Sequence, residues 1–240
     1  MKNCNQKIHN AVFIEQYYIN KIWGCYTMPV NKTELVSFYS HAIAALASFI
    51  GLFILIEAAQ SYIVKILSAV YAISVIALFS ASSLYHGLKR QDNEESLWRK
   101  LDHMAIFIMI AGTYTPVCYL YLPATKAFAI LFFQWLLVAS GILFKLYFFN
   151  APRIIYTTIY LIMGWMAIVV IKDILHIMDS TSLWYLFAGG IAFTAGAVFY
   201  IMQWPKKIQG YVGFHEFFHF FIIAGALCHY LMVYRGVKYM

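Results

Sequence analysis

Apolar residues along the chain come in long runs rather than in the alternating pattern typical of surface strands. After residue 36, seven such runs have about 20 residues each, the length that a helix needs to cross a bilayer. They cover approximately residues 37–58, 62–85, 104–121, 127–148, 154–171, 183–203 and 214–233. The pattern predicts an all-α membrane protein, a bundle of seven transmembrane helices.

Short polar stretches separate these runs. Gln91–Glu95 follows the second run, Pro123 the third, and Asn150 with Pro152 the fourth. Clustered polar residues and prolines end helices, so these boundaries are sharp. The fifth run ends gradually, because polar residues between 172 and 179 follow it without a proline or glycine.

The first 33 residues differ from the rest of the chain, because they mix polar and apolar positions. Two interpretations remain open for this stretch, a disordered tail and a short helix at the membrane surface. We expect two units, an N-terminal cytoplasmic segment (residues 1–33) and the transmembrane domain (residues 34–240). The segment lacks the apolar core of a cleaved signal peptide, so the first span is expected to act as its own insertion signal.

Composition agrees with a membrane protein and excludes several other classes. Hydrophobic residues make up 63% of the chain and charged residues 11%, against about 25% charged in soluble proteins. The net charge of +7 does not indicate nucleic acid, because the basic residues lie at the ends of the apolar runs. The four cysteines form no CxxC pair, so neither a disulfide framework nor a thiolate zinc site is expected.

The distribution of basic residues predicts the orientation. With the N-terminus in the cytoplasm, the inner segments hold 12 of the 17 Lys and Arg residues. The positive-inside rule therefore places the N-terminus in the cytoplasm and, after seven crossings, the C-terminus outside.

The sequence HEFFH, residues 215–219, opens the last apolar run. On a helix His215 and His219 are four residues apart and project from one face, the spacing of a zinc site. The same letters match the HExxH pattern of zinc proteases, in which Glu216 would be the general base. Two amphipathic histidines that reach toward water are the alternative interpretation.

Other polar residues are predicted at the same membrane depth. His86 ends the second span on the cytoplasmic side, with Ser82 one turn before it, and Asp102 opens the third span. The imidazoles of His86, His215 and His219, with a water in the fourth position, would form an open tetrahedral zinc site. Asp102 and Ser82 would then act as catalytic residues beside that water. Asp102 also suits a helix N-terminus, and Ser82 a bond to its own helix.

The remaining histidines of the spans are expected outside this site. His103 is predicted to face the lipid headgroups. His229 follows His219 by ten residues, which is about 15 Å along a helix. For His41 we expect buried packing with a hydrogen bond, and a role beside the metal ligands or at the lipid headgroups is the alternative.

Three segments of the chain stand out together, SSLYH (Ser82–His86), LDHMAIFIMIAGTYTPV (Leu101–Val117) and HEFFHFFIIAGALCH (His215–His229). They resemble the motifs of bacterial hemolysin III proteins, part of the progestin and adipoQ receptor superfamily. The resemblance covers approximately residues 34–235. It implies seven helices with the N-terminus inside, and zinc held by His86, His215 and His219 beside Ser82 and Asp102. It also argues against Glu216 as a protease base.

The favoured hypothesis is a zinc-dependent hydrolase that cleaves amide bonds of membrane lipids, in the inner (plasma) membrane of a bacterium. The alternatives are a non-enzymatic regulator or receptor with a structural zinc, and a pore-forming cytolysin. An intramembrane protease ranks last, because no acidic residue follows His219 as a further ligand. Membrane lipids are the expected partners, a small lipid is the expected ligand, and the sequence does not indicate an oligomeric state.

Overall fold

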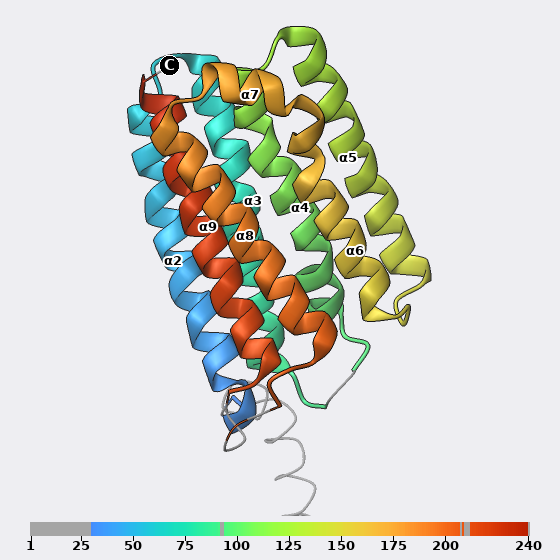
Figure 1. Ribbon diagram of the computed structural model, residues 1–240. Helices are drawn as coiled ribbons and strands as arrows, with labels where there is room; N and C mark the ends of the chain where they lie inside the picture. Colours follow the sequence, from blue (N-terminus) through green and yellow to red (C-terminus); the bar gives the residue numbers. More distant parts are fainter. Residues whose placement is uncertain (1–29, 92–93, 207, 209–211, 240) are drawn as a thin grey trace, which may run out of the picture.

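Long helices make up most of the part of the chain that the computed structural model describes, residues 30–91, 94–206, 208 and 212–239. A short 3₁₀ helix, η1 (Lys32–Glu34), precedes the first of them. The α-helices are α2 (Leu35–Ala58), α3 (Tyr62–Leu88), α4 (Leu97–Tyr121), α5 (Ala124–Tyr147), α6 (Arg153–Gly164), α7 (Ile171–Ile177), α8 (Ser180–Met202) and α9 (Phe214–Tyr239). Among the described residues there is no β-strand, only an isolated bridge between Ile208 and Val212. Figure 1 shows the helices side by side in one bundle.

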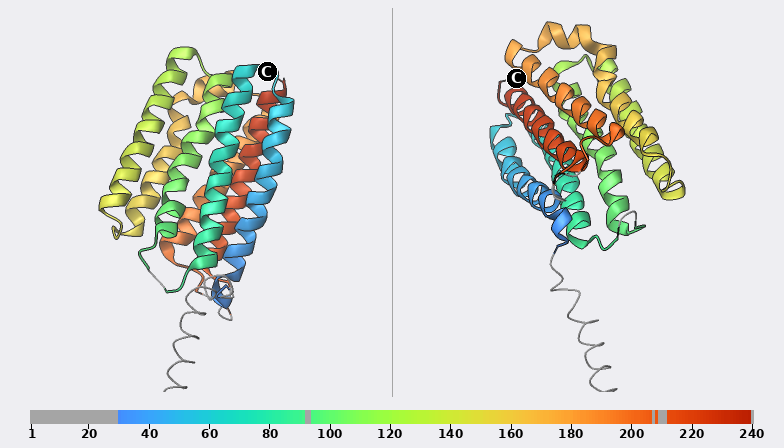
Figure 2. Two further views of the ribbon diagram at one scale, coloured as in Figure 1. Left: turned by 180° about the vertical axis from the view of Figure 1, so that it is seen from behind. Right: turned by 60° about the horizontal axis from the view of Figure 1, so that its bottom comes forward.

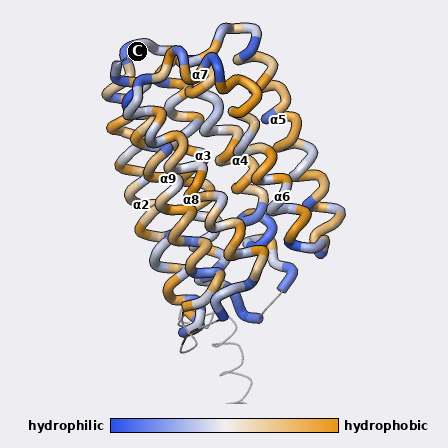
Figure 3. Tube along the Cα trace, in the orientation of Figure 1, coloured by the Kyte–Doolittle hydropathy of each residue, from blue (hydrophilic) through white to orange (hydrophobic). Residues whose placement is uncertain are grey.

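The described residues contain seven helical spans that are long and apolar enough to cross a membrane. The first combines η1 with α2, and the fifth runs from Arg153 to Ile177. Figure 3 shows orange, hydrophobic positions along the helices, with blue positions concentrated toward the ends of the bundle. Large apolar side chains such as Ile43 and Phe128 lie on the outside of the bundle, as expected where a helix meets lipid. The predicted seven-helix class is confirmed.

The third span starts earlier than predicted. Helix α4 begins at Leu97 rather than at Met104, because the Ser96 side chain accepts a hydrogen bond from the Arg99 backbone N–H and caps the helix. Asp102 therefore lies in the second turn. The helix dipole acts mainly on the first turn, so the N-terminal role considered for Asp102 does not fit its position.

The fifth span is broken and extends beyond the predicted end at Ile171. A 3₁₀ segment, η2 (Trp165–Val170), separates α6 from α7. Side chains from neighbouring helices bind the backbone at the break. The Tyr114 hydroxyl donates to the Gly164 carbonyl (2.7 Å) and accepts from the Ala167 N–H (2.8 Å), and Gln134 Nε2 donates to the Met163 carbonyl (2.8 Å).

Helix α9 lies inside the arrangement and contacts α2, α3, α4 and α8. Figure 2 shows it between α2 and α8 from a second direction. Its approach to α8 is close at two glycines. A Cβ atom on Gly189 would lie 2.3 Å from His229 Cδ2, and one on Gly196 would lie 2.9 Å from Phe221 Cβ. Glycine is therefore required where these helices touch.

Helix α8 starts with a side-chain cap. The Asp179 carboxylate accepts from the Thr181 and Ser182 N–H groups at 3.0 and 3.2 Å. The Ser182 hydroxyl and Arg235 also bind this carboxylate, and together these bonds hold the pKa of Asp179 below its ordinary value. Asp179 is thus the cap of the next helix, so the polar residues that follow the fifth apolar run end where α8 begins.

The start of α2 and the end of α9 lie at opposite ends of the bundle (Figure 1). This arrangement is expected, because a chain that crosses the membrane seven times begins and ends on opposite sides. Which end faces the cytoplasm stays a prediction, as does the division into residues 1–33 and 34–240. The proposed surface helix or tail lies outside the described residues.

Candidate metal centre

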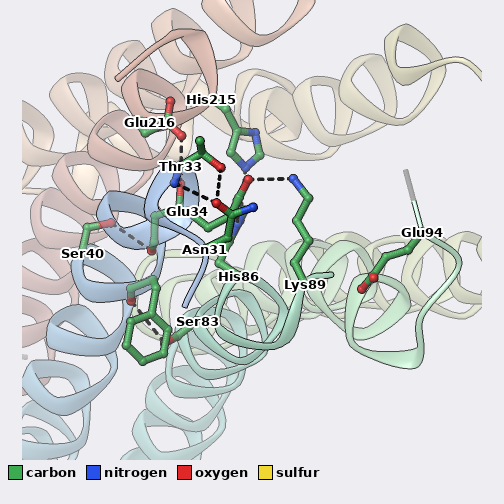
Figure 4. A network of polar contacts seen from close by, with 12 residues as sticks. Asn31, Thr33, Glu34, Ser40, Ser83, His86, Lys89, Glu94, His215 and Glu216 are labelled. Carbon is green, nitrogen blue, oxygen red and sulfur yellow. Dashed lines mark hydrogen bonds and ion pairs between the residues drawn. The ribbon is translucent and has the colours of Figure 1, made fainter. Parts of the chain in front are cut away.

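The histidines of HEFFH occupy the first two turns of α9. Opposite them, His86 occupies the last turn of α3, which ends at Leu88. One ligand atom from each of His86, His215 and His219 lies within 4.8 Å of the other two. His86 Nε2 and His215 Nε2 are 3.1 Å apart. The predicted trio is thus brought together from two helices, and Figure 4 shows two of its members facing each other.

The donor set fits a zinc ion. Glu34 Oε2 lies 2.7 Å from His86 Nδ1, a contact that keeps a proton on Nδ1 and leaves the Nε2 lone pair for a metal. His219 Nδ1 is buried with no hydrogen-bond partner among the described residues. Lone pairs of neutral imidazoles that converge on one point suit Zn²⁺ rather than Ca²⁺ or Mg²⁺, which prefer oxygen ligands.

Glu34 is a site residue that the sequence analysis missed. Its side chain is buried, and besides His86 it binds Lys89 Nζ at 2.8 Å through Oε1 (Figure 4). A carboxylate that orients a metal-binding histidine fixes both its tautomer and its ring position. The available signal was an acidic residue immediately before an apolar run, on the helical face that also carries Ser37 and His41.

Glu216 stabilises the start of α9. Its carboxylate accepts hydrogen bonds from the Gly213 N–H at 2.8 Å and from the Ser37 hydroxyl at 3.3 Å. A glutamate in the first turn that binds back to the residue before the helix is the glutamate half of a capping box. Glu216 is fully buried in this role, which leaves the protease interpretation without its general base.

Asp102 and Ser82 lie together beside the trio. Both are buried, and the Asp102 carboxylate interacts with the Ser82 side chain and lies within electrostatic range of His86. Both side chains line the same cavity as His215 and His219. The carboxylate, the hydroxyl and the two imidazoles of α9 therefore border one space, and His86 lies beside His215 without lining it.

His41 packs against the trio. Its ring stacks on that of His219, with centroids 3.8 Å apart and planes 13° apart. The predicted burial is confirmed. The predicted hydrogen bond of His41 stays a prediction.

His103 and His229 also line the cavity. The prediction that His103 faces the headgroups is therefore wrong, because adjacent positions on α4 both border a wide cavity. Its ring stacks on Phe149 with centroids 6.3 Å apart. His229 Nε2 lies 3.3 Å from the Leu186 carbonyl, away from the metal centre as expected.

The cavity has a volume of about 420 Å³, within the range of about 300–1,000 Å³ typical of small-molecule sites. It lies between α3, α4, α6, α8 and α9, with the metal centre at one end. His215 and His229 both line it and are fourteen residues apart on α9, which corresponds to a helix rise of about 21 Å. Apolar residues form much of the wall, among them Ile106, Ile110, Leu161, Ile168, Phe187 and Phe193.

Comparison with known proteins identifies the family. Residues 30–230 match the model of the haemolysin-III related family. The chain belongs to the haemolysin III family. It is 32% identical over 207 residues to a hemolysin-3 homolog of Bacillus subtilis (strain 168), an alignment that covers 84% of this chain and 93% of that protein. It is 33% identical over 198 residues to hemolysin-3 of Bacillus cereus, covering 81% of this chain and 87% of that protein.

More distant relatives extend the haemolysin III match to eukaryotes. The chain is 24% identical to the human monocyte to macrophage differentiation factor, over 86% of this chain and 85% of that protein. It is 26% identical to the yeast ADIPOR-like receptor IZH2, over 82% of this chain and 69% of that protein. The predicted membership of the hemolysin III and adipoQ receptor group is confirmed, and with it a multi-pass membrane protein.

Proposed function

We propose that this haemolysin III protein binds zinc through His86, His215 and His219 and hydrolyses an acyl amide bond of a membrane lipid. The observation that carries the proposal is the convergence of three imidazoles, two of which line a largely apolar cavity together with the Asp102 carboxylate. The site thus combines three possible zinc ligands, a carboxylate that can accept a proton, and a cavity that can hold an acyl chain.

The residues around the centre have separate tasks. A bound zinc ion supplies a Lewis acid that polarises a carbonyl and makes water acidic near neutral pH. The Asp102 carboxylate accepts the proton of the attacking water and then passes it to the leaving amine nitrogen. Ser82 orients that carboxylate. Glu34 holds the His86 ring.

The cavity selects a substrate with a long apolar part. Its depth along α9 is about 21 Å, roughly two thirds of the hydrocarbon core of a bilayer. A lipid acyl chain in this space places its carbonyl at the end where the imidazoles lie. The apolar walls exclude water from the chain and favour lipids over water-soluble amides.

Metal analysis of the purified protein tests the ligand set. We expect wild-type protein to contain about one zinc ion, and the His86→Ala and His215→Ala variants to lose it, because two imidazoles hold zinc weakly. The matched control is His176→Ala, since His176 is exposed and lies in α7 near the opposite end of the bundle. Full zinc content in both site variants would rule out the ligand set.

Turnover of N-acyl lipids by the purified protein tests the reaction. Asp102→Asn removes the proton acceptor but keeps its shape, so we expect release of fatty acid to fall by about 10²–10⁴-fold with zinc content unchanged. Mass spectrometry of the released acid gives the rate. Equal rates for wild type and Asp102→Asn would contradict the role of Asp102.

A second candidate is a regulator in which the zinc is structural. The trio joins the last turn of α3 to the first turns of α9, and a metal that bridges helices stabilises a fold directly. In that case chelation would lower the melting temperature of the purified protein, while no lipid amide would be cleaved at any zinc content.

A further inference from the structure

Three cationic side chains gather at the polar end of the cavity. Arg99, Lys145 and Arg153 all line it, and they come from the start of α4, the end of α5 and the start of α6. Figure 1 shows these helix ends at the same end of the bundle. Asp102 is the only carboxylate that lines the cavity within the described part of the chain. With neutral histidines, the lining therefore carries an excess of two positive charges.

Lys145 is the central member of this cationic cluster, Arg99, Lys145 and Arg153. Its side chain is 1% exposed, and its ammonium donates one hydrogen bond, to the Phe149 carbonyl at 3.3 Å. The ammonium lies 3.8 Å from the Tyr156 ring centroid and 4.7 Å from that of Phe149. Among the described residues no carboxylate lies within ion-pair distance of it.

A buried ammonium with one carbonyl partner is unusual. It has three N–H donors, and the charge is costly to bury unless it is paired. The aromatic rings of Phe149 and Tyr156 compensate in part through cation–π contacts. The remaining donors border the cavity and are suited to an anion inside it.

The two arginines add further positive charge to the lining. Arg99 Cζ lies 5.0 Å from the centroid of the same Phe149 ring, and its guanidinium donates to the Glu94 backbone carbonyl at 3.2 Å. Arg153 Cζ lies 5.1 Å from the Tyr200 ring centroid. Neither arginine forms an ion pair with a carboxylate among the described residues. Arginine binds oxyanions such as phosphate through two parallel hydrogen bonds.

We propose that the cationic cluster binds the phosphate monoester headgroup of a single-chain lipid, with the chain in the apolar part of the cavity. A phosphate monoester carries close to two negative charges at neutral pH, which match the local excess of two positive charges. A ligand with a carboxylate headgroup carries one negative charge and would neutralise only half of this excess. The inference names the substrate class of the hydrolase and in that respect rests on the proposed function, but the binding itself requires neither zinc nor turnover.

The ligand is a lipid rather than free phosphate because the cationic cluster opens onto an apolar space. Ile106, Leu161 and Phe193 line the same cavity as Lys145. Burial of each CH₂ group there contributes roughly 0.8 kcal/mol, so the chain supplies affinity and the cluster supplies selectivity for the headgroup.

Isothermal titration calorimetry of the full-length protein in a neutral detergent tests the site. We expect wild-type protein to bind hexadecyl phosphate at least about tenfold more tightly than hexadecanol, one charge-assisted contact being enough for that ratio. Lys145→Met should reduce the preference to below about threefold, and Lys145→Arg should keep it. The matched control is Lys126→Met, which lies on the same helix in an exposed pair with Asp173 and should behave as wild type.

Further probes decide between ligand sources. Palmitate should bind more weakly than hexadecyl phosphate, and inorganic phosphate alone more weakly still. Palmitate that binds as tightly as hexadecyl phosphate would overturn the phosphate assignment, and equally tight inorganic phosphate would overturn the lipid assignment. Equal binding of hexadecanol and hexadecyl phosphate to the wild type would overturn the site itself, even if the Lys145 variants fail to fold.

Chelated protein separates this inference from the proposed function. The preference for hexadecyl phosphate should persist after zinc is removed, because Lys145 and the arginines hold the anion. A preference that disappears on chelation would mean that the metal binds the headgroup, and would contradict the role of the cluster. Absence of zinc or of turnover in the wild type would remove the hydrolase but leave the headgroup site in place.

Discussion

Glu34 connects the start of the first span to the metal centre at the level of a single residue. Its two carboxylate oxygens bind different partners, His86 at 2.7 Å and Lys89 at 2.8 Å. Lys89 keeps the carboxylate in place, and the carboxylate keeps the His86 ring aimed at His215. The carboxylate, rather than the HEFFH glutamate, is the acidic residue that supports the ligand set.

Substitution of Glu34 should therefore weaken zinc binding without abolishing it. We expect Glu34→Gln to lower zinc affinity by about 10–100-fold, the usual effect of losing an outer partner of a metal-binding histidine. Competition with a zinc-binding fluorophore measures the change. Glu57→Gln is the control, since Glu57 lies exposed near the other end of the first span. Wild-type affinity in Glu34→Gln would mean that the carboxylate does not orient His86.

The site residues differ in how well the sequence predicts them. The histidines of α9 were predictable because a spacing of four residues places two side chains on one helix face. Topology added His86 and Asp102, because both were assigned to one membrane depth. The sequence marked Glu34 only as an acidic residue before an apolar run; its bond to His86 was not predictable, since the partner is 52 residues away and the bond depends on how α2 and α3 pack.

At the scale of elements, α8 and α9 approach each other closely at Gly189. The next residue, Gly190, does not lie at this contact. A Cβ atom on Gly189 would meet His229 Cδ2 at 2.3 Å and the Gly225 carbonyl at 3.2 Å. A Cβ atom on Gly190 would meet nothing closer than Trp165, at 3.8 Å. The two positions therefore form a natural pair for comparison.

Gly189→Ala should lower stability by about 1–3 kcal/mol, the range for overpacking a tight contact. Gly190→Ala should leave stability unchanged or raise it by up to about 1 kcal/mol, because alanine favours helix over glycine. Thermal melting in detergent, followed by circular dichroism, measures both. Equal melting temperatures for the two variants would contradict the close approach of α8 and α9 at this point.

Element boundaries were predicted less well than element number. The seven apolar runs were sufficient to count the spans, because hydrophobicity over 20 residues is a strong signal. The start of α4 was missed, since four of the seven residues from 97 to 103 are polar and the cap depends on one serine. The break in the fifth span was invisible, because its residues, WMAIVV, are as apolar as an unbroken helix.

For the whole molecule, the direction of insertion decides which compartment the metal centre serves. The trio and the start of α2 lie at the same end of the bundle, because α3 ends and α9 begins there. If this end is cytoplasmic, as the positive-inside rule predicts, the proposed hydrolase would release its water-soluble product inside the cell.

Fusions to the C-terminus test this orientation. The distribution of Lys and Arg predicts that the C-terminus is outside, so alkaline phosphatase fused there should be active and a fluorescent protein fused there should be dark. Fusions after residue 149, in the connector between α5 and α6, should give the opposite result. A fluorescent C-terminal fusion would reverse the predicted orientation.

The break in the fifth span has a mechanical consequence. Hydrogen-bonding groups in hydrocarbon must find partners, and at this bend Tyr114 and Gln134 supply them from α4 and α5. The bend is thus stabilised by side chains from outside its own helix. Because η2 lines the cavity, these hydrogen bonds also set the shape of its wall. The double substitution Tyr114→Phe and Gln134→Leu should therefore allow the fifth span to straighten and change the shape of the cavity.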